Sequence, residues 1–227
     1  MALSLRGFIK AHTTYGFRRT ARNLLEEFRR GHLHYAALKK AKRLSCQDNL
    51  KLNVGCGANI KPSWVNIDNS SDTDALHLDV REGLPFPDGS ALIVYSEHFF
   101  EHLEYPDEAL KFLRESWRVL IPGGVFSLGI PDFELEVTAY VTRDEEFYRV
   151  RRRHYTHPPW VDTRMHVLNH VFRQGADHKC SYDFETLAGE LAEVGFVSIV
   201  RRPFDSSLDT LRREFGTLYV EARKPGA

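Results

Sequence analysis

The segment "YSEHFFEHLEYP" holds the side chains whose types and spacing are best suited to chemistry. His98 and His102 lie four residues apart, and Glu101 directly precedes the second histidine. This is the H-x-x-E-H pattern of the inverted zinc peptidases. Such a pattern belongs in the middle of a long helix and needs a further protein ligand downstream. Here Ser96 ends an apolar strand and Pro106 restarts the chain, so the sequence predicts a strand-to-helix junction with no metal.

The two histidines are expected to differ in role. His98 lies nearest the strand end and is predicted to face the cleft, where an imidazole that titrates near neutral pH can act as general base. His102, one helical turn further on, is predicted to be structural and to hydrogen-bond the loop. Phe99 and Phe100 are predicted to belong to the core.

The segment "NVGCGAN" places two glycines directly after an apolar strand. Gly55 and Gly57 allow a tight turn and let a ligand approach the backbone without a Cβ in the way. Asp68 ends the next predicted strand, where a carboxylate can accept hydrogen bonds from both hydroxyls of a ribose. Asp79 ends the third predicted strand and could accept one from an adenine amine. The sequence therefore predicts a nucleoside pocket.

The spacing of these residues favours one kind of nucleoside. A dinucleotide loop reads G-x-G-x-x-G, opens a long helix and has its acid about 20 residues further on. Here Asp68 follows Gly57 after eleven residues, and the third glycine is missing. The following "NIKP" leaves little room for a helix N-terminus to bind a pyrophosphate. We therefore expect an adenosine without phosphates, as in S-adenosylmethionine. A nicotinamide-dependent oxidoreductase is the alternative enzyme.

Short apolar segments that alternate with helical patterns must position these side chains. Strands are predicted over 51–56, 64–68, 75–80, 91–96, 125–130, 198–202 and 217–222. Helices are predicted over 106–120, where Pro122-Gly123-Gly124 follows as a stop, and over 184–194, where Gly195 follows as a cap. This alternation predicts an α/β, Rossmann-like fold with a mostly parallel, seven-stranded sheet and helices on both faces. Ligands of such a sheet bind outside the carboxyl ends of its strands.

Residues 1–47 differ from the rest of the chain in charge. They hold eleven basic and two acidic residues, a net charge of +9, so the remaining 180 residues carry −9. Helices are predicted over 17–30, ending at Gly31, and around 34–44. A basic helical arm of this kind can contact anionic lipid at a membrane surface, nucleic acid, or the acidic body of the chain itself. Nucleic acid is disfavoured because the arm lacks the aromatic interleaving of a base-stacking groove.

The compartment is predicted from cysteine use and from the start of the chain. Three widely spaced cysteines fit a reducing compartment, so a cytoplasmic location is expected. The first 25 residues contain arginines and hydroxyl residues but no acids, so an organelle transit segment is the alternative.

Residues 132–183 interrupt the alternation of strands and helices. They are predicted to form a helical insertion over the open end of the sheet, since they are too long for a simple connection. They include five of the eleven histidines and the basic run "RVRRRH", which favours an anionic acceptor. The candidate acceptor contacts are His154, Tyr155, His157, His166, His170 and Tyr182. His178 and Cys180 indicate a metal only weakly, because nothing nearby completes four ligands.

With these motifs in order, the chain resembles the class I S-adenosylmethionine-dependent methyltransferases, in particular the small-molecule enzymes of the ubiquinone-biosynthesis type, the methyltransferase type 11 group. The resemblance covers residues 50–133 and resumes from 184 to the end. It is carried by "LNVGCG", "VNID", "LHLDV", "LPFPDGSALIVYSEHFFEHL" and "RVLIPGGVFSLGIPD". Two departures are an asparagine in place of the usual acid in the first strand and a shortened helix after the glycine loop.

The resemblance implies a set of cofactor contacts. Those for the methionine and ribose portions are Asn53, Gly55, Cys56, Gly57 and Asp68. Asp79 and Val80 would meet the adenine, and Ser96, Glu97 and His98 would lie near the sulfonium.

The function implied by the resemblance is transfer of a methyl group from S-adenosylmethionine to an oxygen or nitrogen, less readily a carbon, of a small molecule. An anionic or sugar-containing acceptor is favoured. Residues 48–227 would form the methyltransferase domain, with residues 1–47 as an arm. The alternative from another class is a non-catalytic methyltransferase-like adaptor that binds a membrane or nucleic acid through this arm.

Overall fold

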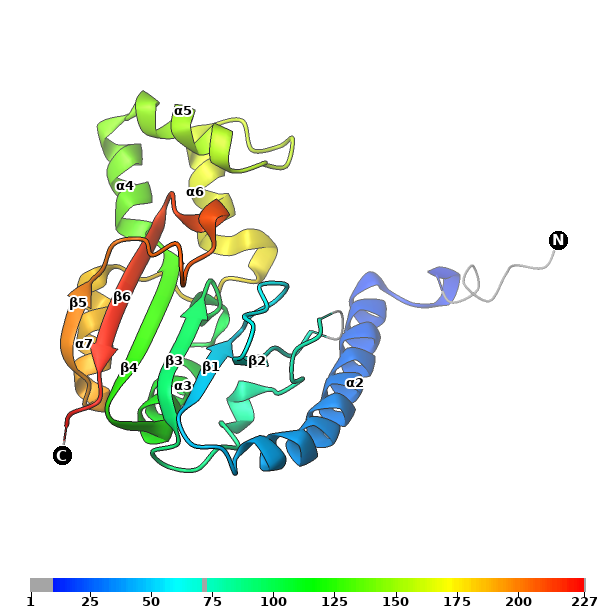
Figure 1. Cartoon of the computed structure of the whole chain (residues 1–227). Coiled ribbons are helices and arrows are strands. Elements are labelled where there is room, and N and C mark those ends of the chain that lie inside the picture. Colours follow the sequence, from blue (N-terminus) through cyan, green and yellow to red (C-terminus); the bar gives the residue numbers. More distant parts are fainter. Residues whose placement is uncertain (1–9, 71–72, 227) are drawn as a thin grey trace.

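The structure is a computed structural model that describes residues 10–70 and 73–226 (Figure 1). Its described residues form a six-stranded sheet with the strand order β2-β1-β3-β4-β6-β5. The strands are β1 (Leu50–Val54), β2 (Val65–Ile67), β3 (Ala91–Glu97), β4 (Leu120–Pro131), β5 (Val197–Arg201) and β6 (Thr217–Arg223). The first four run parallel, and β6 is antiparallel to both of its neighbours. The predicted α/β class with a mostly parallel sheet is confirmed.

The chain reverses its direction of strand addition at β1. It passes from β1 to β2 on one side and then to β3 on the other. Val54 pairs with Ser96, so the carboxyl ends of β1 and β3 lie side by side. Connections that leave in opposite directions from such a pair of ends open a crevice between them. The glycine loop after β1 and the histidine segment after β3 both start at this crevice.

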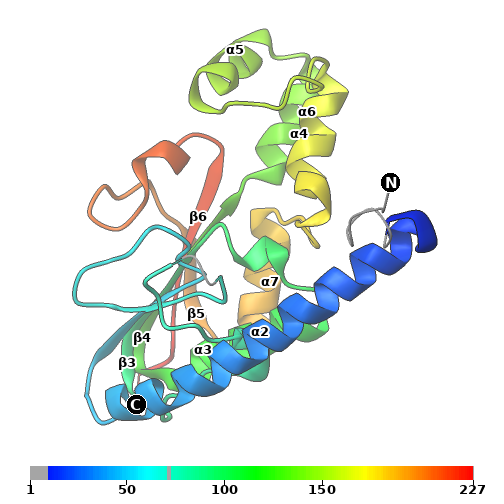
Figure 2. The ribbon, with the colours of Figure 1, turned by 90° about the vertical axis from the view of Figure 1, so that its right-hand side faces the viewer.

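Six α-helices and four 3₁₀ turns are described. The α-helices are α2 (Tyr15–Leu44), α3 (Asp107–Val119), α4 (Phe133–Thr142), α5 (Glu145–His154), α6 (Arg164–Arg173) and α7 (Phe184–Val194). The turns are η1 (Val80–Glu82), η2 (Phe100–His102), η3 (Gln174–Ala176) and η4 (Leu211–Arg213). Helices α3 and α7 pack together on one face of the sheet, and α2 crosses the same side (Figure 2). The prediction of α7 and its Gly195 cap is confirmed.

The main core lies between the sheet and this helical layer. On α3 the apolar positions 109, 112, 113 and 119 recur at helical spacing and are all buried. The Phe112 ring contacts those of Phe99, Phe100 and Phe126. On the opposite face the Tyr95 hydroxyl donates to Asp209, 3.2 Å away, so a coil segment covers β3 there.

Helices α4, α5 and α6 stand above the carboxyl ends of the strands (Figure 1). They share a second, smaller core whose buried members are Phe133, Ala139, Phe147, Tyr148, Val167 and Val171. The side chains of Asp132, Asp144 and Thr163 cap the three helices by accepting from the backbone N–H three residues on. Residues 132–183 therefore carry a helical layer of their own at the end of the sheet where the crevice opens.

The predicted strand over 75–80 is wrong, and the sheet has six strands instead of seven. Residue Leu76 makes only an isolated bridge to Ile67. The Asp79 backbone N–H donates to His34 Nδ1 on α2 at 3.0 Å, and the Asp79 side chain caps η1. Helix α2 thus takes a hydrogen bond that a strand would have used in a ladder. Strand β4 is longer than predicted and runs through residues 122–124.

The predicted helix stop at Gly31 is also wrong, because α2 is continuous from Tyr15 to Leu44. A glycine inside a helix costs about 1 kcal/mol relative to alanine. Burial of His34, Ala37 and Ala41 against the body offsets that cost in the second half of the helix. The first half stands clear of the body in Figure 1. Residues 1–9 of the predicted arm, with the start of the transit-like segment, lie outside the described residues.

Replacing Phe112 tests where the stability of the fold resides. Phe112→Ala is expected to lower the free energy of unfolding by about 3–5 kcal/mol, because it leaves a cavity in the aromatic cluster. Phe28→Ala is the control, since that ring is 70% exposed on α2, and it should change the free energy by less than about 0.5 kcal/mol. Denaturant unfolding measures both, and equal losses would contradict this assignment of the core.

Candidate active site

The glycine loop begins where β1 ends and adopts the left-handed conformation twice. Gly55 has φ +65° and Gly57 has φ +50°. A Cβ at Gly55 would lie 2.1 Å from Phe99 Cγ, so no other residue fits there without displacing Phe99. The Gly57 N–H donates to Asp68 Oδ2 at 2.8 Å. The acid after β2 thus fixes the loop after β1.

Asn53, in β1, makes hydrogen bonds that stabilise this loop, and Cys56 lies within the loop between its two glycines. Asn53 Nδ2 donates to the Asn59 carbonyl at 2.9 Å and to Asn66 Oδ1 at 2.8 Å. Its amide therefore holds the segment that follows the glycines in place. Burial and the nearby Asp68 carboxylate raise the pKa of the Cys56 thiol to about 12, so it stays protonated. Both residues line a narrow cleft beside the loop, together with Glu97.

A cavity of about 470 Å³ opens at the ends of β1 and β2. Its lining includes four of the predicted cofactor contacts, which are Gly55, Asp68, Asp79 and Val80. Phe99 and His102 form the wall on the side of β3, and Arg30 reaches it from α2. The volume lies within the range of about 300–1,000 Å³ that small-molecule sites have. The structure therefore brings the glycine loop and both strand-end acids to one cavity.

The two strand-end acids of this cavity differ in how much of their hydrogen-bonding capacity is left. Among residues 10–70 and 73–226, Asp68 accepts one backbone N–H on each oxygen, from Gly57 at 2.8 Å and from Ser70 at 2.7 Å, and a carboxylate oxygen can accept a second hydrogen bond. Asp79 accepts from Arg81 through the backbone N–H at 3.0 Å and through the guanidinium at 2.6–3.1 Å. Burial opposes ionisation, but these hydrogen bonds hold the pKa of Asp79 below its usual value.

Sequence reasoning missed the cationic residues of the cavity. Arg81, two positions after Asp79, could have been found as a local side-chain partner of that acid. Arg30 and Lys179 come from α2 and from the return of the insertion. Neither carries a local signal, because only the fold brings those segments to the cavity.

Ser96 and Glu97, at the end of β3, are buried, and Glu97 has a structural function. Its carboxylate accepts from the Thr210 N–H at 3.1 Å, the Thr210 hydroxyl at 2.6 Å and Arg213 at 3.3 Å. These contacts hold η4 against the strand end. Ser96 Oγ has no hydrogen-bond partner among the described residues.

His98 follows at φ +52° and is partly buried between β6 and η2. Its Nε2 lies 2.8 Å from Thr217 Oγ1, and its Nδ1 lies 3.7 Å from Glu101 Oε1. Burial, with nearby Arg213, holds the pKa of His98 well below its usual value, so the ring is neutral near pH 7. Burial also raises the pKa of Glu101 to about 8. The predicted hydrogen bond from His102 to a loop is present, to the Asp177 carbonyl at 3.2 Å.

A second cavity, of about 120 Å³, lies on the insertion side of His98. Three predicted acceptor contacts, Tyr155, His157 and His170, line it. It shares Arg151 and His157 with a larger space of about 800 Å³ between α4, α5 and α6. The two spaces therefore adjoin at these residues, and His98 lines the smaller one; we refer to the adjoining pair as the path.

The other predicted acceptor contacts lie elsewhere. His154 stacks on Phe215 and is exposed. His166 pairs with Asp162 at 2.6 Å near the surface. Tyr182 is in the main core, against the ring of Phe100, because its segment packs under η2. The last assignment is therefore corrected.

The comparisons with known proteins agree with this geometry. Residues 55–128 match the family model of a methyltransferase domain, the stretch from the glycine loop to the middle of β4. The chain carries a methyltransferase domain. The enzyme is a methyltransferase, and its cofactor is S-adenosylmethionine. No curated protein matches the sequence.

Solved structures similar to the methyltransferase chain are distant in sequence. A methyltransferase described as a possible histamine N-methyltransferase, from Thermotoga maritima, is 14% identical with a TM-score of 0.47, over 92% of this chain and 98% of that one. An S-adenosylmethionine-dependent methyltransferase from Archaeoglobus fulgidus is 16% identical with a TM-score of 0.48, over 93% and 100%. The complex between the Haloferax volcanii Trm112 methyltransferase activator and a putative methyltransferase is also similar. The sequence identity is 18% and the TM-score is 0.48, over 90% of this chain and 94% of that one.

The residues that line the cavity of about 470 Å³ in this methyltransferase fit S-adenosylmethionine. Its lining holds five acids, Asp68, Asp79, Glu104, Glu108 and Asp177, against the three cations Arg30, Arg81 and Lys179. An excess of carboxylates suits a ligand that carries a sulfonium and an ammonium group. The free capacity of Asp68 suits the hydroxyls of a ribose.

Removing the Asp68 carboxylate tests this cofactor assignment. Asp68→Ala is expected to weaken S-adenosylmethionine binding about tenfold or more, because hydrogen bonds to a charged group contribute about 1.5–3 kcal/mol. Isothermal calorimetry measures the Kd for the cofactor and for its demethylated product, with NAD as a ligand that should not bind. Asp88→Ala is the control, since that side chain is 79% exposed and pairs with Arg118. An unchanged Kd in Asp68→Ala would contradict the assignment.

Proposed function

We propose that this methyltransferase transfers its methyl group to an oxygen or nitrogen of a small anionic or sugar-containing molecule. The observation that carries the proposal is the space of about 800 Å³ between α4, α5 and α6. Four arginines line it, Arg143, Arg151, Arg152 and Arg164, against the acids Glu145 and Asp162. Such an excess of guanidinium groups favours phosphate or carboxylate ligands.

Two of the four arginines are available to a ligand. Arg151 pairs with the buried Glu136, and Arg164 pairs with Glu145. Arg143 and Arg152 are exposed and form no ion pair within residues 10–70 and 73–226. Arg143 is the C-cap residue of α4, and Arg152 lies in the last turn of α5.

The inner part of the path is suited to holding an acceptor near the cofactor cavity. Both ring nitrogens of His157 are buried with no hydrogen-bond partner in the described part of the chain, so they can bind acceptor hydroxyls. S-adenosylmethionine supplies an electrophilic methyl group on its sulfonium. The residues around it need to hold the acceptor in line with that group and exclude water. His98 lies between the two cavities and stays the predicted proton acceptor.

An activity screen with a charge-reversal pair tests the acceptor class. Purified protein with labelled S-adenosylmethionine should methylate compounds in the anionic fraction of a metabolite extract. Arg152→Glu is expected to lower kcat/KM for the identified acceptor about tenfold or more, with the KM for S-adenosylmethionine unchanged, because it removes a cation from the path.

The matched control is Arg153→Glu, which makes the same charge change at the next position of α5 but does not line the space. It should leave kcat/KM within about twofold, a difference of about 0.4 kcal/mol. Methylation confined to uncharged compounds, or equal losses in both variants, would overturn the anionic acceptor.

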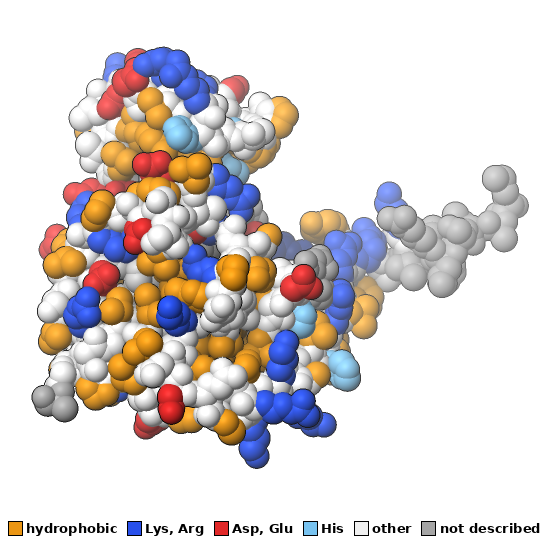
Figure 3. Space-filling view, viewed as in Figure 1, with side chains coloured by type: hydrophobic (Ala, Val, Ile, Leu, Met, Phe, Trp, Pro, Cys, Tyr) orange, Lys and Arg blue, Asp and Glu red, His pale blue; other side chains and the backbone are white. Residues whose placement is uncertain are grey.

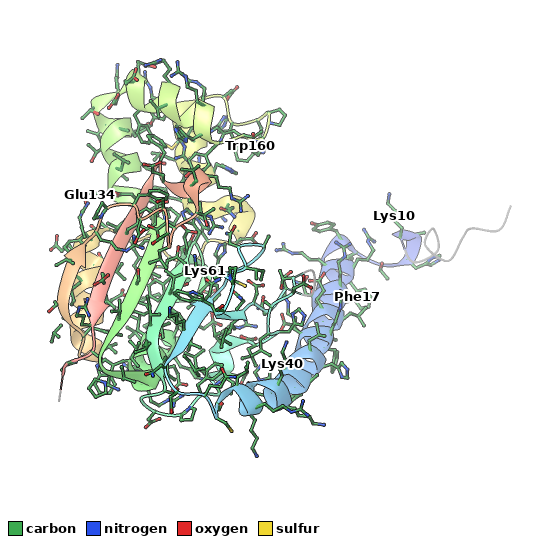
Figure 4. The ribbon with its side chains drawn as sticks, viewed as in Figure 1. Lys10, Phe17, Lys40, Lys61, Glu134 and Trp160 are labelled. Carbon is green, nitrogen blue, oxygen red and sulfur yellow. The ribbon has the colours of Figure 1, made fainter. Side chains whose placement is uncertain are left out.

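We also propose that the first half of α2 binds an anionic membrane surface. Its hydrophobic side chains Phe17, Leu24, Leu25 and Phe28 are 56–70% exposed and share one face of the helix. Figure 4 places Phe17 on the part of α2 that stands away from the body. By helical spacing, Arg18, Arg22 and Arg29 follow one edge of this apolar face. Blue and orange side chains both lie on the arm in Figure 3. An apolar face bordered by cations fits the interface of an anionic bilayer.

None of the described helices has the length and apolar character needed to cross a bilayer. The proposed contact is therefore with the surface. The second half of α2 stays on the body through His34, Ala37 and Ala41. Docking by the first half would hold the catalytic domain beside the lipid.

Vesicle sedimentation tests this contact. The protein should bind vesicles that contain phosphatidylserine at least about tenfold more tightly than vesicles of phosphatidylcholine, because each cation near an anionic surface contributes about 1 kcal/mol. Leu25→Glu should abolish the difference. Leu211→Glu is the control, since Leu211 is equally exposed on η4. Equal binding to both vesicle types, or a dimer that buries α2 in light scattering, would overturn the proposal.

A further inference from the structure

A carboxylate with no partner lies in the wall between the two cavities. Glu101 is fully buried, and neither of its side-chain oxygens has a hydrogen-bond partner in the described part of the chain. Burying an ionised carboxylate without a partner costs several kcal/mol. A proton or a bound cation must therefore neutralise such a group.

Three imidazole nitrogens face this carboxyl group without reaching it. His98 Nδ1 lies 3.7 Å, His178 Nε2 3.9 Å and His102 Nε2 4.0 Å from Glu101 Oε1. These distances exceed those of a hydrogen bond. One ligand atom from each of Glu101, His102 and His178 lies within 4.8 Å of the others.

Backbone hydrogen bonds show which nitrogens carry hydrogen. His102 Nδ1 contacts the Asp177 carbonyl at 3.2 Å, and His178 Nδ1 contacts the Val171 carbonyl at 2.6 Å. A carbonyl only accepts, so both Nδ1 atoms are donors, and a neutral ring then has a bare lone pair on Nε2. Two imidazole lone pairs therefore face the Glu101 carboxyl group, and a metal ion bound between them would displace the carboxyl proton.

We propose that Glu101, His102 and His178 bind a divalent transition metal ion, with Zn²⁺ as the first candidate. Two imidazoles and one glutamate are the protein ligands of a class of catalytic zinc sites. Ligand atoms at about 2.0–2.1 Å from a tetrahedral ion lie about 3.4 Å apart. Small side-chain rotations would bring the three atoms in from their present 3.9–4.8 Å.

The surroundings of the cluster have the features of a metal site. The backbone contacts to His102 and His178 are those that orient metal-binding imidazoles in known sites. The two halves of the cluster are tied together, because the Lys179 and Cys180 N–H groups donate to the Glu101 carbonyl at 2.8 and 3.3 Å. The sequence analysis predicted no metal at the strand-to-helix junction, where no third ligand was identified. In the structure the insertion brings His178 next to η2, and His178 is the third ligand of the proposed site.

The place of the cluster indicates what an ion would do. His102 lines the cofactor cavity, and His178 lines the acceptor cavity together with His98. Three protein ligands leave a coordination position open. An acceptor oxygen bound there would have its pKa lowered, as metal-bound water does. The metal site itself rests on the cluster alone, but this role rests on the proposed acceptor chemistry.

Metal titration of the chelator-treated full-length protein tests the site. Wild type is expected to bind one Zn²⁺ per chain, with a Kd in the micromolar range or below. His178→Asn removes the Nε2 ligand but keeps an N–H near the Val171 carbonyl, and it should weaken Zn²⁺ binding at least about a hundredfold. His166→Asn is the matched control on the exposed face of α6 and should bind as wild type does.

X-ray absorption on the wild-type zinc complex gives a readout that needs no variant. It should show two imidazoles in the zinc shell, and a shell with sulfur or with one imidazole or none would overturn the site. No Zn²⁺ binding by wild type, or equal binding by His178→Asn, would overturn it as well. Calorimetry with S-adenosylmethionine on the same samples separates this result from the cofactor assignment, because that cavity should bind with the metal removed.

Discussion

The packing of Phe99 against a bare backbone at Gly55 is the constraint on which the site depends. A single Cβ there would lie 2.1 Å from the ring. Because position 55 has none, the segment after β3 can lie directly against the loop after β1. This contact closes the cofactor cavity on one side. The same contact positions His98 and η2 next to the insertion. The cofactor cavity and the smaller cavity at His98 therefore both depend on the packing of Phe99 on Gly55.

The polar groups near the strand ends divide into those that hold the structure and those left for ligands. The Glu97 carboxylate accepts hydrogen bonds that hold η4, and the Asp79 carboxylate accepts them from Arg81. Asp68 fixes the glycine loop but keeps acceptor capacity. Glu101 is the exception, since it is buried and its carboxyl oxygens have no hydrogen-bond partner among the residues that the structure describes. In a low-dielectric interior such a group has a strong effect on whatever binds beside it.

Helix α2 links the basic arm to the catalytic body. In its second half His34 accepts from the Asp79 N–H, and Arg30 lines the cofactor cavity. The arm thus folds partly onto the acidic body, as its charge allowed. Its first half keeps an exposed apolar face. Helix α2 therefore lines the cofactor cavity through its second half and exposes apolar side chains to the surroundings through its first half.

Local patterns in the sequence determined the parallel sheet, the glycine loop with Asp68, and helix α7 with its cap. Each of these depends on residues close together in the chain, whose periodicity and backbone preferences are visible in the sequence. The tertiary structure alone decided that residues 75–80 form no strand and that α2 continues through Gly31, because packing outweighs local preference there. It also decided which groups surround Glu101. His178 Nε2 lies 3.9 Å from Glu101 Oε1 although the two residues are far apart in the chain, and such an approach leaves no periodic mark in the sequence.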